Sequence, residues 1–277
     1  MKPFKMMIIP VMLICIALLG GFTNKYDNGA KIELNKEWKY AGESAICSGS
    51  ATMYKAESNR KNITIGVNAG HATTGGTSKK TYCHPDHTPK LTGGTTKKGA
   101  LQAAAVSYGM TFPDKTPEAA VNLKVALYLK EILLNNGYDV LIIREGDDIQ
   151  LDNVARTVIC NNAADCHISI HFDSDGLDYD KGCFYMSTPG GLKSTEPVKS
   201  TWEKSEALGK SLIEGLKESG CKIKKTPCME LDLTQTSYST VPSIDIELGN
   251  QCSDHSDAAL LRDAQGLAKG VDLFFAQ

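Results

Sequence analysis

Four side chains able to bind a metal or move a proton lie beside apolar runs of the sequence. His71 follows the run ITIGVNAG, and His171 ends the run CHISIH. Glu247 ends the run SIDIE, whereas Glu118 begins a segment with helical periodicity. Two imidazoles and one carboxylate are a known catalytic zinc set that leaves one coordination position for water. A further carboxylate beside such a site can serve as a general base, so these residue types predict metal-assisted hydrolysis.

The elements that must position these residues alternate along the chain from residue 62 onwards. Apolar alternation predicts strands at 62–70, 138–144, 165–171, 182–187 and 242–250. Apolar spacing and end signals predict helices at 116–137, 151–164, 202–219 and 257–276. We therefore expect an α/β fold: a mostly parallel, twisted sheet of about six strands with helices on both faces, in a single catalytic domain. Ligands collect beyond the carboxyl ends of strands in such sheets, where three of the four side chains fall.

Composition divides the chain into segments. Residues 1–22 combine Lys2 and Lys5 with an apolar run of roughly 14 residues, which predicts export by a cleaved signal peptide or a retained N-terminal membrane anchor. Residues 23–60 are polar and aperiodic, which predicts a linker or poorly ordered extension. Residues 61–277 form the predicted catalytic domain. Within it, residues 72–117 form a long insertion, rich in Thr, Gly and Lys, that would line or cover the site.

Charge and cysteine content exclude other classes of protein. The net charge is −2, from 30 basic and 32 acidic residues, so no sustained basic field favours nucleic acid as a partner. Eight of the nine cysteines follow the N-terminal segment, an even number that allows disulfides in an exported chain. No two of them have the Cys-x-x-Cys spacing of a zinc ribbon.

Four sequence blocks follow one another in the predicted domain: VNAGHATTGG at 67–76, EAAVNLKVALYLKEILLNNGYDVLIIRE at 118–145, VARTVICNNAADCHISIH at 154–171 and IDIELGNQCSDHSDAALL at 244–261. In this order they resemble the zinc-dependent N-acetylmuramoyl-L-alanine amidases of the amidase type 3 family. Together they cover nearly all of the predicted domain, so the resemblance is more specific than one short motif.

The resemblance implies hydrolysis of the amide bond between N-acetylmuramic acid and L-alanine, with Zn²⁺ as the cofactor and peptidoglycan as the partner. It implies that His71, Glu118 and His171 are the zinc ligands. Glu247 corresponds to the catalytic glutamate, which takes a proton from water and delivers one to the leaving amine. A membrane tether through the N-terminal segment and a protein activator stay open.

Three further residues fall in or beside these blocks. Asn122 lies one helical turn after Glu118, on the same face, where it would orient a ligand or substrate or serve the fold. Asn68 stands where the family usually has the Asp of Asp-Pro-Gly-His-Gly, so an amide replaces a carboxylate that could orient the first histidine. Arg156 matches a family position, with an ion pair at the edge of the core as the favoured alternative. The 46 residues between His71 and Glu118 exceed the family's usual spacing of about 15.

Other histidines offer rival sites. Cys83, His84 and His87 form a close Cys-His-x-x-His group within the insertion. His167 is four residues before His171, about 13 Å away along a strand, so it cannot share the metal. His255 precedes the last helix, where a solvated or capping role is expected.

Two other functions fit the same residues. One is a zinc peptidase that cuts within the peptide stem, which has the same chemistry but another substrate. The other is a wall-binding module that has lost its activity. All four positions implied in catalysis are filled, which favours an enzyme.

Overall fold

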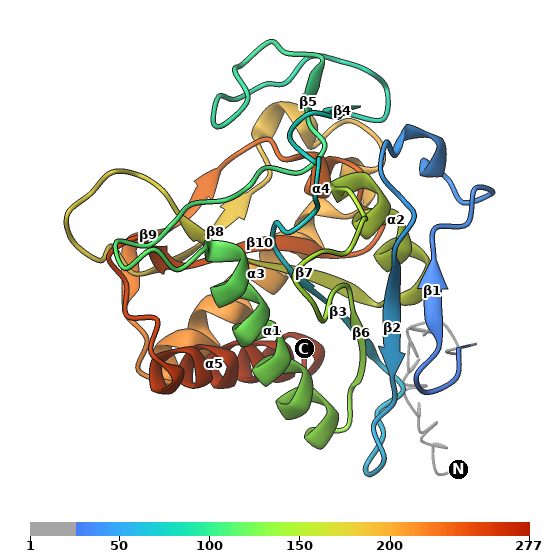
Figure 1. The fold of residues 1–277 in the computed structure, drawn as a ribbon. Helices are drawn as coiled ribbons and strands as arrows, with labels where there is room; N and C mark the ends of the chain where they lie inside the picture. The colour runs from blue at the N-terminus through green and yellow to red at the C-terminus, as the bar shows by residue number, and fades with distance from the viewer. Residues whose placement is uncertain (1–25) are drawn as a thin grey trace, which may run out of the picture.

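One large sheet organises residues 26–277, the part of the chain that the computed structural model describes (Figure 1). Its strands, in spatial order, are β1 (Lys31–Glu33), β2 (Ser50–Tyr54), β6 (Asp139–Ile142), β3 (Thr64–Ala69), β7 (Cys166–Asp173), β10 (Ser243–Asn250), β8 (Cys183–Ser187) and β9 (Ile223–Glu230). The four central strands, β6, β3, β7 and β10, are parallel, whereas β2 and β8 run antiparallel to them. The predicted α/β fold is confirmed, with eight strands in the sheet instead of about six.

Helices cover both faces of this sheet. One face carries α1 (Glu118–Asn135), α3 (Trp202–Glu218) and α5 (Asp257–Phe275). The other carries α2 (Asn153–Ala163) and the short α4 (Thr234–Ser237). Single turns of 3₁₀ helix occur at η1 (Ala41–Glu43), η2 (Gly190–Leu192) and η3 (Val198–Ser200). The four predicted helices are therefore present in the fold.

Alternation along two central strands separates the core from the polar residues. Ile168 and Ile170 of β7 belong to the large core beneath α1 and α5, as do Ile244 and Ile246 of β10. Because successive side chains of a strand point to opposite faces, the residues between them face the other way. The polar residues of both strands thus share the face opposite α1, and they approach the site at the carboxyl ends of the strands.

Residues 26–60 do not form the linker or poorly ordered extension that their polarity suggested. β2 pairs with β6, and β1 pairs with β2, so this segment extends the sheet. Ala51 and Met53 are fully buried against the layer that contains α2. The apolar part is only a few residues long between polar flanks, so its burial depends on the partner strand more than on its own pattern.

The insertion, residues 72–117, is ordered and anchored at several points. It contains the hairpin of β4 (Lys80–Tyr82) and β5 (Gln102–Ala104), and its outer loop projects at the top of Figure 1. His84 Nε2 lies 2.9 Å from the buried carboxylate of Asp232, which precedes α4. The insertion therefore packs against the segment that precedes α4.

The predicted signal peptide or membrane anchor at 1–22 lies outside the described residues. Among helices within residues 26–277, none combines the length and the apolar character needed to cross a membrane.

Candidate metal centre

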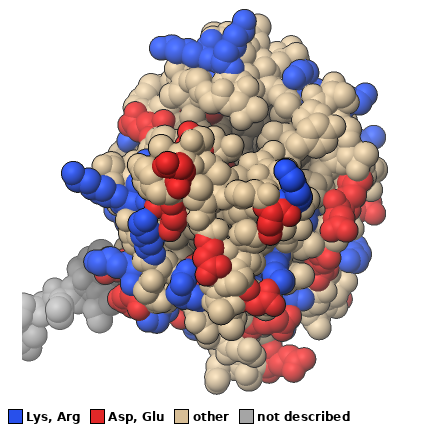
Figure 2. Space-filling model, turned by 60° about the vertical axis from the view of Figure 1, so that its left-hand side comes forward, with Lys and Arg blue, Asp and Glu red and all other residues tan. Residues whose placement is uncertain are grey.

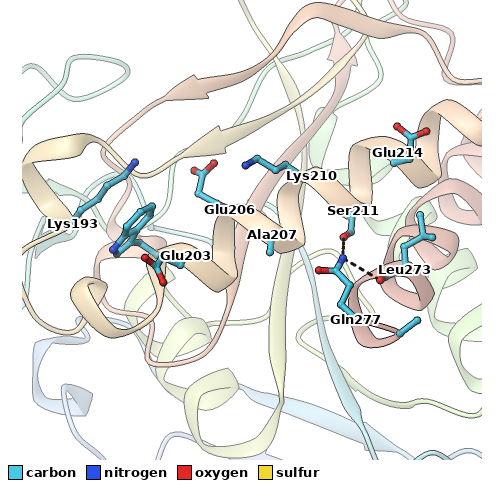
Figure 3. A pocket seen from close by; sticks show the side chains of 11 residues that line it. Lys193, Glu203, Glu206, Ala207, Lys210, Ser211, Glu214, Leu273 and Gln277 are labelled. Carbon is cyan, nitrogen blue, oxygen red and sulfur yellow. Dashed lines mark hydrogen bonds between the residues drawn. The ribbon is translucent and has the colours of Figure 1, made fainter. Parts of the chain in front are cut away.

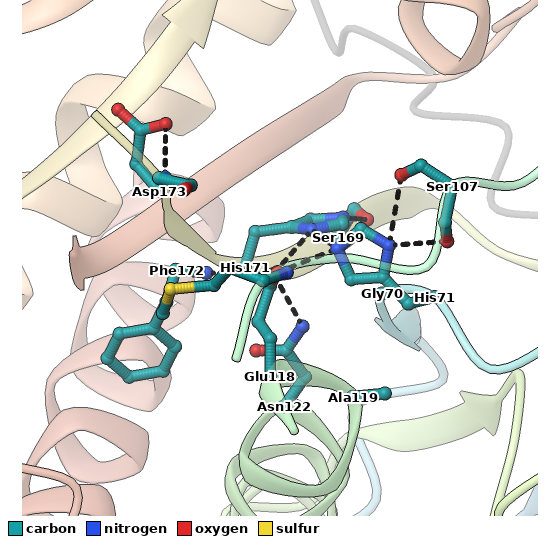
Figure 4. Close-up of polar contacts among 12 residues, drawn as sticks. Gly70, His71, Ser107, Glu118, Ala119, Asn122, Ser169, His171, Phe172 and Asp173 are labelled. Atoms are coloured by element: carbon teal, nitrogen blue, oxygen red, sulfur yellow. Dashed lines mark hydrogen bonds and ion pairs between the residues drawn. The ribbon is translucent and has the colours of Figure 1, made fainter. Parts of the chain in front are cut away.

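Three predicted ligands converge beyond the carboxyl ends of β3 and β7 (Figure 4). His71 lies in the turn after β3, Glu118 is the first residue of α1, and His171 lies near the end of β7. His71 Nε2 is 2.9 Å from Glu118 Oε1, and His171 Nδ1 is 3.0 Å from His71 Nε2 and 3.1 Å from Glu118 Oε1. The fold thus brings together residues separated by up to 100 positions in the sequence. One side-chain nitrogen or oxygen of each residue points toward the same small region.

The turn that carries His71 has an unusual backbone. His71 and Ala72 both have positive φ, 66° and 58°, a region that side chains with a Cβ disfavour. Gly70, just before them, lies against the ring of His171, where a Cβ would approach within 2.1 Å of Cε1. The close approach of β3 and β7 at the site therefore depends on glycine at this position.

Arg156 stabilises the backbone of the turn that carries His71. Its fully buried guanidinium donates to the carbonyl oxygens of Ala69 and His71 and to Asn68 Oδ1. These partners are carbonyl and amide oxygens. The ion pair favoured from the sequence is thus not found among the described residues, and Arg156 acts on the backbone beside His71.

The outer hydrogen bonds of the two histidines decide which ring nitrogens carry hydrogen. His71 Nδ1 donates to the Ser107 carbonyl oxygen at 2.9 Å, which leaves the lone pair of Nε2 facing Glu118. His171 Nε2 lies 3.1 Å from Ser169 Oγ and 3.5 Å from Asp245 Oδ2, a carboxylate that only accepts. The lone pair of His171 Nδ1 therefore points at the same place as that of His71.

These lone pairs suit a bound cation. Two ring nitrogens and a carboxylate oxygen, all acceptors in this arrangement, lie within 3.1 Å of one another, which only a cation or a proton between them compensates. Burial alone would raise the pKa of Glu118, but its interactions with the neighbouring His171 and His71 lower it overall. Burial alone would lower the pKa of His171, but Asp245 and Glu118 raise it overall. The residues present thus fit a divalent metal with one carboxylate and two imidazole ligands.

Glu247 lies beside these ligands on β10. It is directly opposite His171 in the parallel register of β10 and β7, so the two side chains leave the sheet on the same face. The residue is 7% exposed, and its Oε2 has no hydrogen-bond partner among the described residues. Burial, and then the neighbouring charge of Asp245, raise the pKa of Glu247 well above its usual range. A carboxyl with raised pKa and a free oxygen is suited to exchanging protons.

Asn122 and Asn68 also contact the site. Asn122 Nδ2 donates to Glu118 Oε1 at 3.1 Å, and Asn68 Nδ2 donates to Ser169 Oγ at 3.2 Å. Asn68 therefore reaches the His171 side of the site through Ser169, whereas the sequence had suggested an effect on the first histidine.

Some contacting residues were not identified from the sequence. Asp245 and Ser169 each precede a predicted site residue by two positions in an alternating strand, and that spacing was the available signal. Ser107, Gly109 and Met110 of the insertion had no such signal, because the surrounding sequence has no period.

The rival metal group does not assemble. His84 lies between Thr88 and Asp232, whereas His87 stacks on Tyr82 and contacts Glu43. In the described part of the chain, the metal-binding group found is the one formed by His71, Glu118 and His171.

The remaining histidines have other surroundings. His167 is fully buried, and burial lowers its pKa to about 3. His255 lies 3.0 Å from Asp114 of the insertion and packs against Phe112, so it is a partner of the insertion more than a solvated or capping residue.

A separate groove of about 860 Å³ lies between α3 and the end of α5 (Figure 3). Its lining includes Trp202, Glu206 and Lys210. At its edge, Gln277 Nε2 donates a hydrogen bond to Ser211 Oγ. None of its lining residues belongs to the metal-binding group. Acidic and basic side chains are intermixed over the face shown in Figure 2, as the balanced composition leads one to expect.

Comparisons with known proteins agree with this geometry. The model of the N-acetylmuramoyl-L-alanine amidase family matches residues 65–273. Searching the curated proteins finds no match to this sequence. Among solved structures, the N-acetylmuramyl-L-alanine amidase Ami1 of Mycobacterium smegmatis is similar with a TM-score of 0.65 and 16% identity, over 79% of this chain and 99% of that one.

Two further structures have the same fold. Ami1 of Mycobacterium abscessus has a TM-score of 0.63 and 18% identity, over 77% of this chain and 98% of that one. The CwlD amidase of Clostridioides difficile, solved in complex with the GerS lipoprotein, has a TM-score of 0.55 and 18% identity, over 77% of this chain and 98% of that one.

The family match includes all three converging ligands and Glu247, and the sheet that carries them has the fold of these amidases. This chain therefore belongs to the N-acetylmuramoyl-L-alanine amidase family.

Proposed function

We propose that the protein is a zinc-dependent enzyme that hydrolyses the amide bond between N-acetylmuramic acid and L-alanine in peptidoglycan. The observation that carries this proposal is the convergence of His71 Nε2, His171 Nδ1 and Glu118 Oε1, with the free carboxyl oxygen of Glu247 on the same face. Two imidazoles and one carboxylate are a ligand set of catalytic zinc sites, whereas structural zinc sites usually have four protein ligands, so this set supports a catalytic metal.

In this proposal His71, Glu118 and His171 hold the metal, and Glu247 moves protons. Bound zinc supplies a Lewis acid that polarises the scissile carbonyl and makes water more acidic. Glu247 accepts a proton from the attacking water and then donates one to the amine that leaves as the amino terminus of L-alanine. Its buried position and raised pKa favour the return of that proton. Asn122 donates a hydrogen bond to Glu118 Oε1 and thereby orients the Glu118 carboxylate.

The proposal places the enzyme outside the cytoplasm, at the cell wall. Residues 1–22 would direct export or tether the chain to the membrane, and residues 61–277 would act as the catalytic domain. We also propose a protein partner, in the manner of the related CwlD amidase and the GerS lipoprotein.

Digestion of purified peptidoglycan tests the bond that is cut. Free stem peptides with a new amino-terminal alanine are the expected products, and cuts within the stem would point to a peptidase instead. Metal analysis of the same preparation should find about one zinc per chain. The His71→Ala variant should lose both the metal and the activity, and an active, metal-free variant would contradict the proposal.

A further inference from the structure

The insertion passes directly beside the metal ligands at residues 107–110. The carbonyl oxygen of Ser107 accepts a hydrogen bond from His71 Nδ1 at 2.9 Å. The backbone N–H of Met110 donates to Glu118 Oε2 at 2.8 Å, and the N–H of Glu118 donates to the Met110 carbonyl oxygen at 3.0 Å. Two of the three ligands thus have a direct backbone partner in the insertion.

Each of these bonds acts on a particular ligand atom. The bond to Ser107 keeps hydrogen on His71 Nδ1, so Nε2 presents its lone pair to the metal position. The bond from Met110 engages Glu118 Oε2, so Oε1 is the oxygen that faces the histidines. Hydrogen bonds of this kind typically contribute 10- to 100-fold to metal affinity, on the order of what we expect here.

Gly109 allows the backbone to come this close. Its φ is +82°, and a Cβ at this position would lie 2.6 Å from both Glu118 Oε2 and His71 Cδ2. Real Cβ atoms do not approach other atoms so closely, and both neighbours are buried. The path of the insertion therefore requires a residue without a side chain at the point where it crosses the ligands.

The flanking residues keep this segment in place. Ala105 and Val106 are buried, and the Ala105 carbonyl oxygen accepts from the N–H of Asn153 at the start of α2. On the other side, the buried Phe112 packs edge to face on Phe172, with ring centroids 5.5 Å apart. Residues 107–110 are thus held from both ends against the site.

We propose that residues 107–110 of the insertion are positioning residues of the metal centre, which set the tautomer of His71 and the orientation of Glu118. This inference rests on the proposed function, because it takes His71 and Glu118 as zinc ligands. It makes the insertion a structural component of the site, in addition to any effect on substrate access.

Two glycines of the insertion provide a matched test in the full chain. Gly99 has φ +83°, nearly the same as Gly109, but a Cβ there meets no atom within 4 Å. Gly99→Ala therefore introduces the same backbone strain without the contact with His71 and Glu118. We expect Gly99→Ala to keep the zinc dissociation constant within about twofold of the wild type, and Gly109→Ala to raise it by at least about tenfold.

Spectroscopy separates positioning from a general loss of stability. The absorption spectrum of the cobalt-substituted protein reports ligand geometry, so Gly109→Ala should change it and Gly99→Ala should not. Ser107→Ala is not a neutral control, because it removes a hydroxyl that lies 3.2 Å from His71 Nδ1, so Gly99→Ala is the matched comparison. Equal zinc affinities and equal spectra for the two glycine variants would overturn the inference.

Amide hydrogen exchange in the wild-type protein gives a second test that needs no variant. If the hydrogen bond from the Met110 N–H to Glu118 favours zinc binding, bound zinc must in turn stabilise that hydrogen bond, because the coupling between two equilibria is reciprocal. Zinc should slow amide exchange at Met110 by about tenfold or more. Exchange at Gly99, whose N–H donates a hydrogen bond to the Lys90 carbonyl oxygen, should not change. Unchanged exchange at Met110 would contradict the inference. A wild-type protein that binds no zinc would instead contradict the proposed function.

Discussion

Glu247 and His171 lie directly opposite each other on two parallel strands, β10 and β7. The same register pairs Asp245 with Ser169, so a row of polar side chains crosses the sheet on one face, while the intervening isoleucines fill the core on the other. The proposed metal ligand and the proposed proton carrier are thus positioned by sheet hydrogen bonding, which resists displacement.

Replacement of Glu247 by Gln tests its proton transfer. The amide keeps the size of the side chain but cannot exchange protons, so turnover should fall on the order of 10²- to 10⁴-fold, while zinc content stays near one per chain. Glu206→Gln is the control. Glu206 accepts a hydrogen bond from the Tyr185 hydroxyl and lines the groove beside α3, away from the proposed metal ligands. Undiminished turnover in Glu247→Gln would refute the role.

Asp245→Asn tests the carboxylate beside His171. Asp245 Oδ2 lies 3.5 Å from His171 Nε2, and this charge makes the imidazole a better metal ligand. Zinc competition with a chelator should give a dissociation constant about 10- to 100-fold higher in the variant. Burial raises the pKa of Asp245, so the neutral amide should not lower the free energy of unfolding of the metal-free protein. Ser169→Ala removes the 3.1 Å contact with His171 and the 3.2 Å hydrogen bond from Asn68 without removing a charge, and it serves as the comparison.

Ala72→Gly tests the backbone strain next to His71. Ala72 has φ +58°, a conformation that costs a non-glycine residue on the order of 1 kcal/mol. Chemical denaturation should show the glycine variant to be more stable by up to about 1 kcal/mol, less the greater entropy of glycine in the unfolded chain. Ala104→Gly in β5, where φ is not positive, should instead destabilise the protein. A loss of stability in Ala72→Gly would show that the turn is unstrained.

His84→Ala tests the anchor of the insertion and the rival metal site together. Removing His84 leaves the buried Asp232 without its imidazole partner, which should destabilise the protein by about 3 kcal/mol. Limited proteolysis should then cut within residues 84–100 faster than in the wild type. Zinc content should remain near one per chain. Loss of that zinc would instead support a metal site at Cys83, His84 and His87.

Acid should weaken the loop between β7 and β8. Asp175 is paired with Lys181 at 2.6 Å and accepts from Asn250. Burial alone would raise the pKa of Asp175, but these bonds lower it to about 2. A lowered pKa stabilises the fold above the unfolded value, near 4, and this contribution is lost as the pH falls towards 2.

The Asp175→Asn variant measures this contribution. Asp175 as a whole residue is exposed, although its side chain is only 19% exposed, so partial solvent screening keeps the effect to about 1 kcal/mol. The wild type should exceed the variant in free energy of unfolding at pH 6, and the difference should vanish near pH 2. Asp178→Asn in the same loop is the control. A difference independent of pH would show that the ion pair is not its source.

The sequence by itself predicted the α/β class, the four long helices and the central strands, and it singled out the three residues that converge in the structure, together with Glu247. These features have strong local patterns: apolar alternation in strands, helical spacing, and polar residues placed where strands end. Four family-like blocks then assigned chemistry to those residues.

Only the tertiary structure decided the surroundings of the ligands. β1 and β2 have short, weak patterns and are strands because β6 offers a free edge. Ser107 and Met110 contact His71 and Glu118 through backbone atoms, which every residue has, so no residue type marks them. Gly109 is needed because of what lies 2.6 Å away, in segments distant along the chain. Contacts between segments that are distant in sequence and have no periodic pattern leave no local signal in the sequence. Here such contacts connect residues 107–110 to His71 and Glu118 of the candidate metal centre.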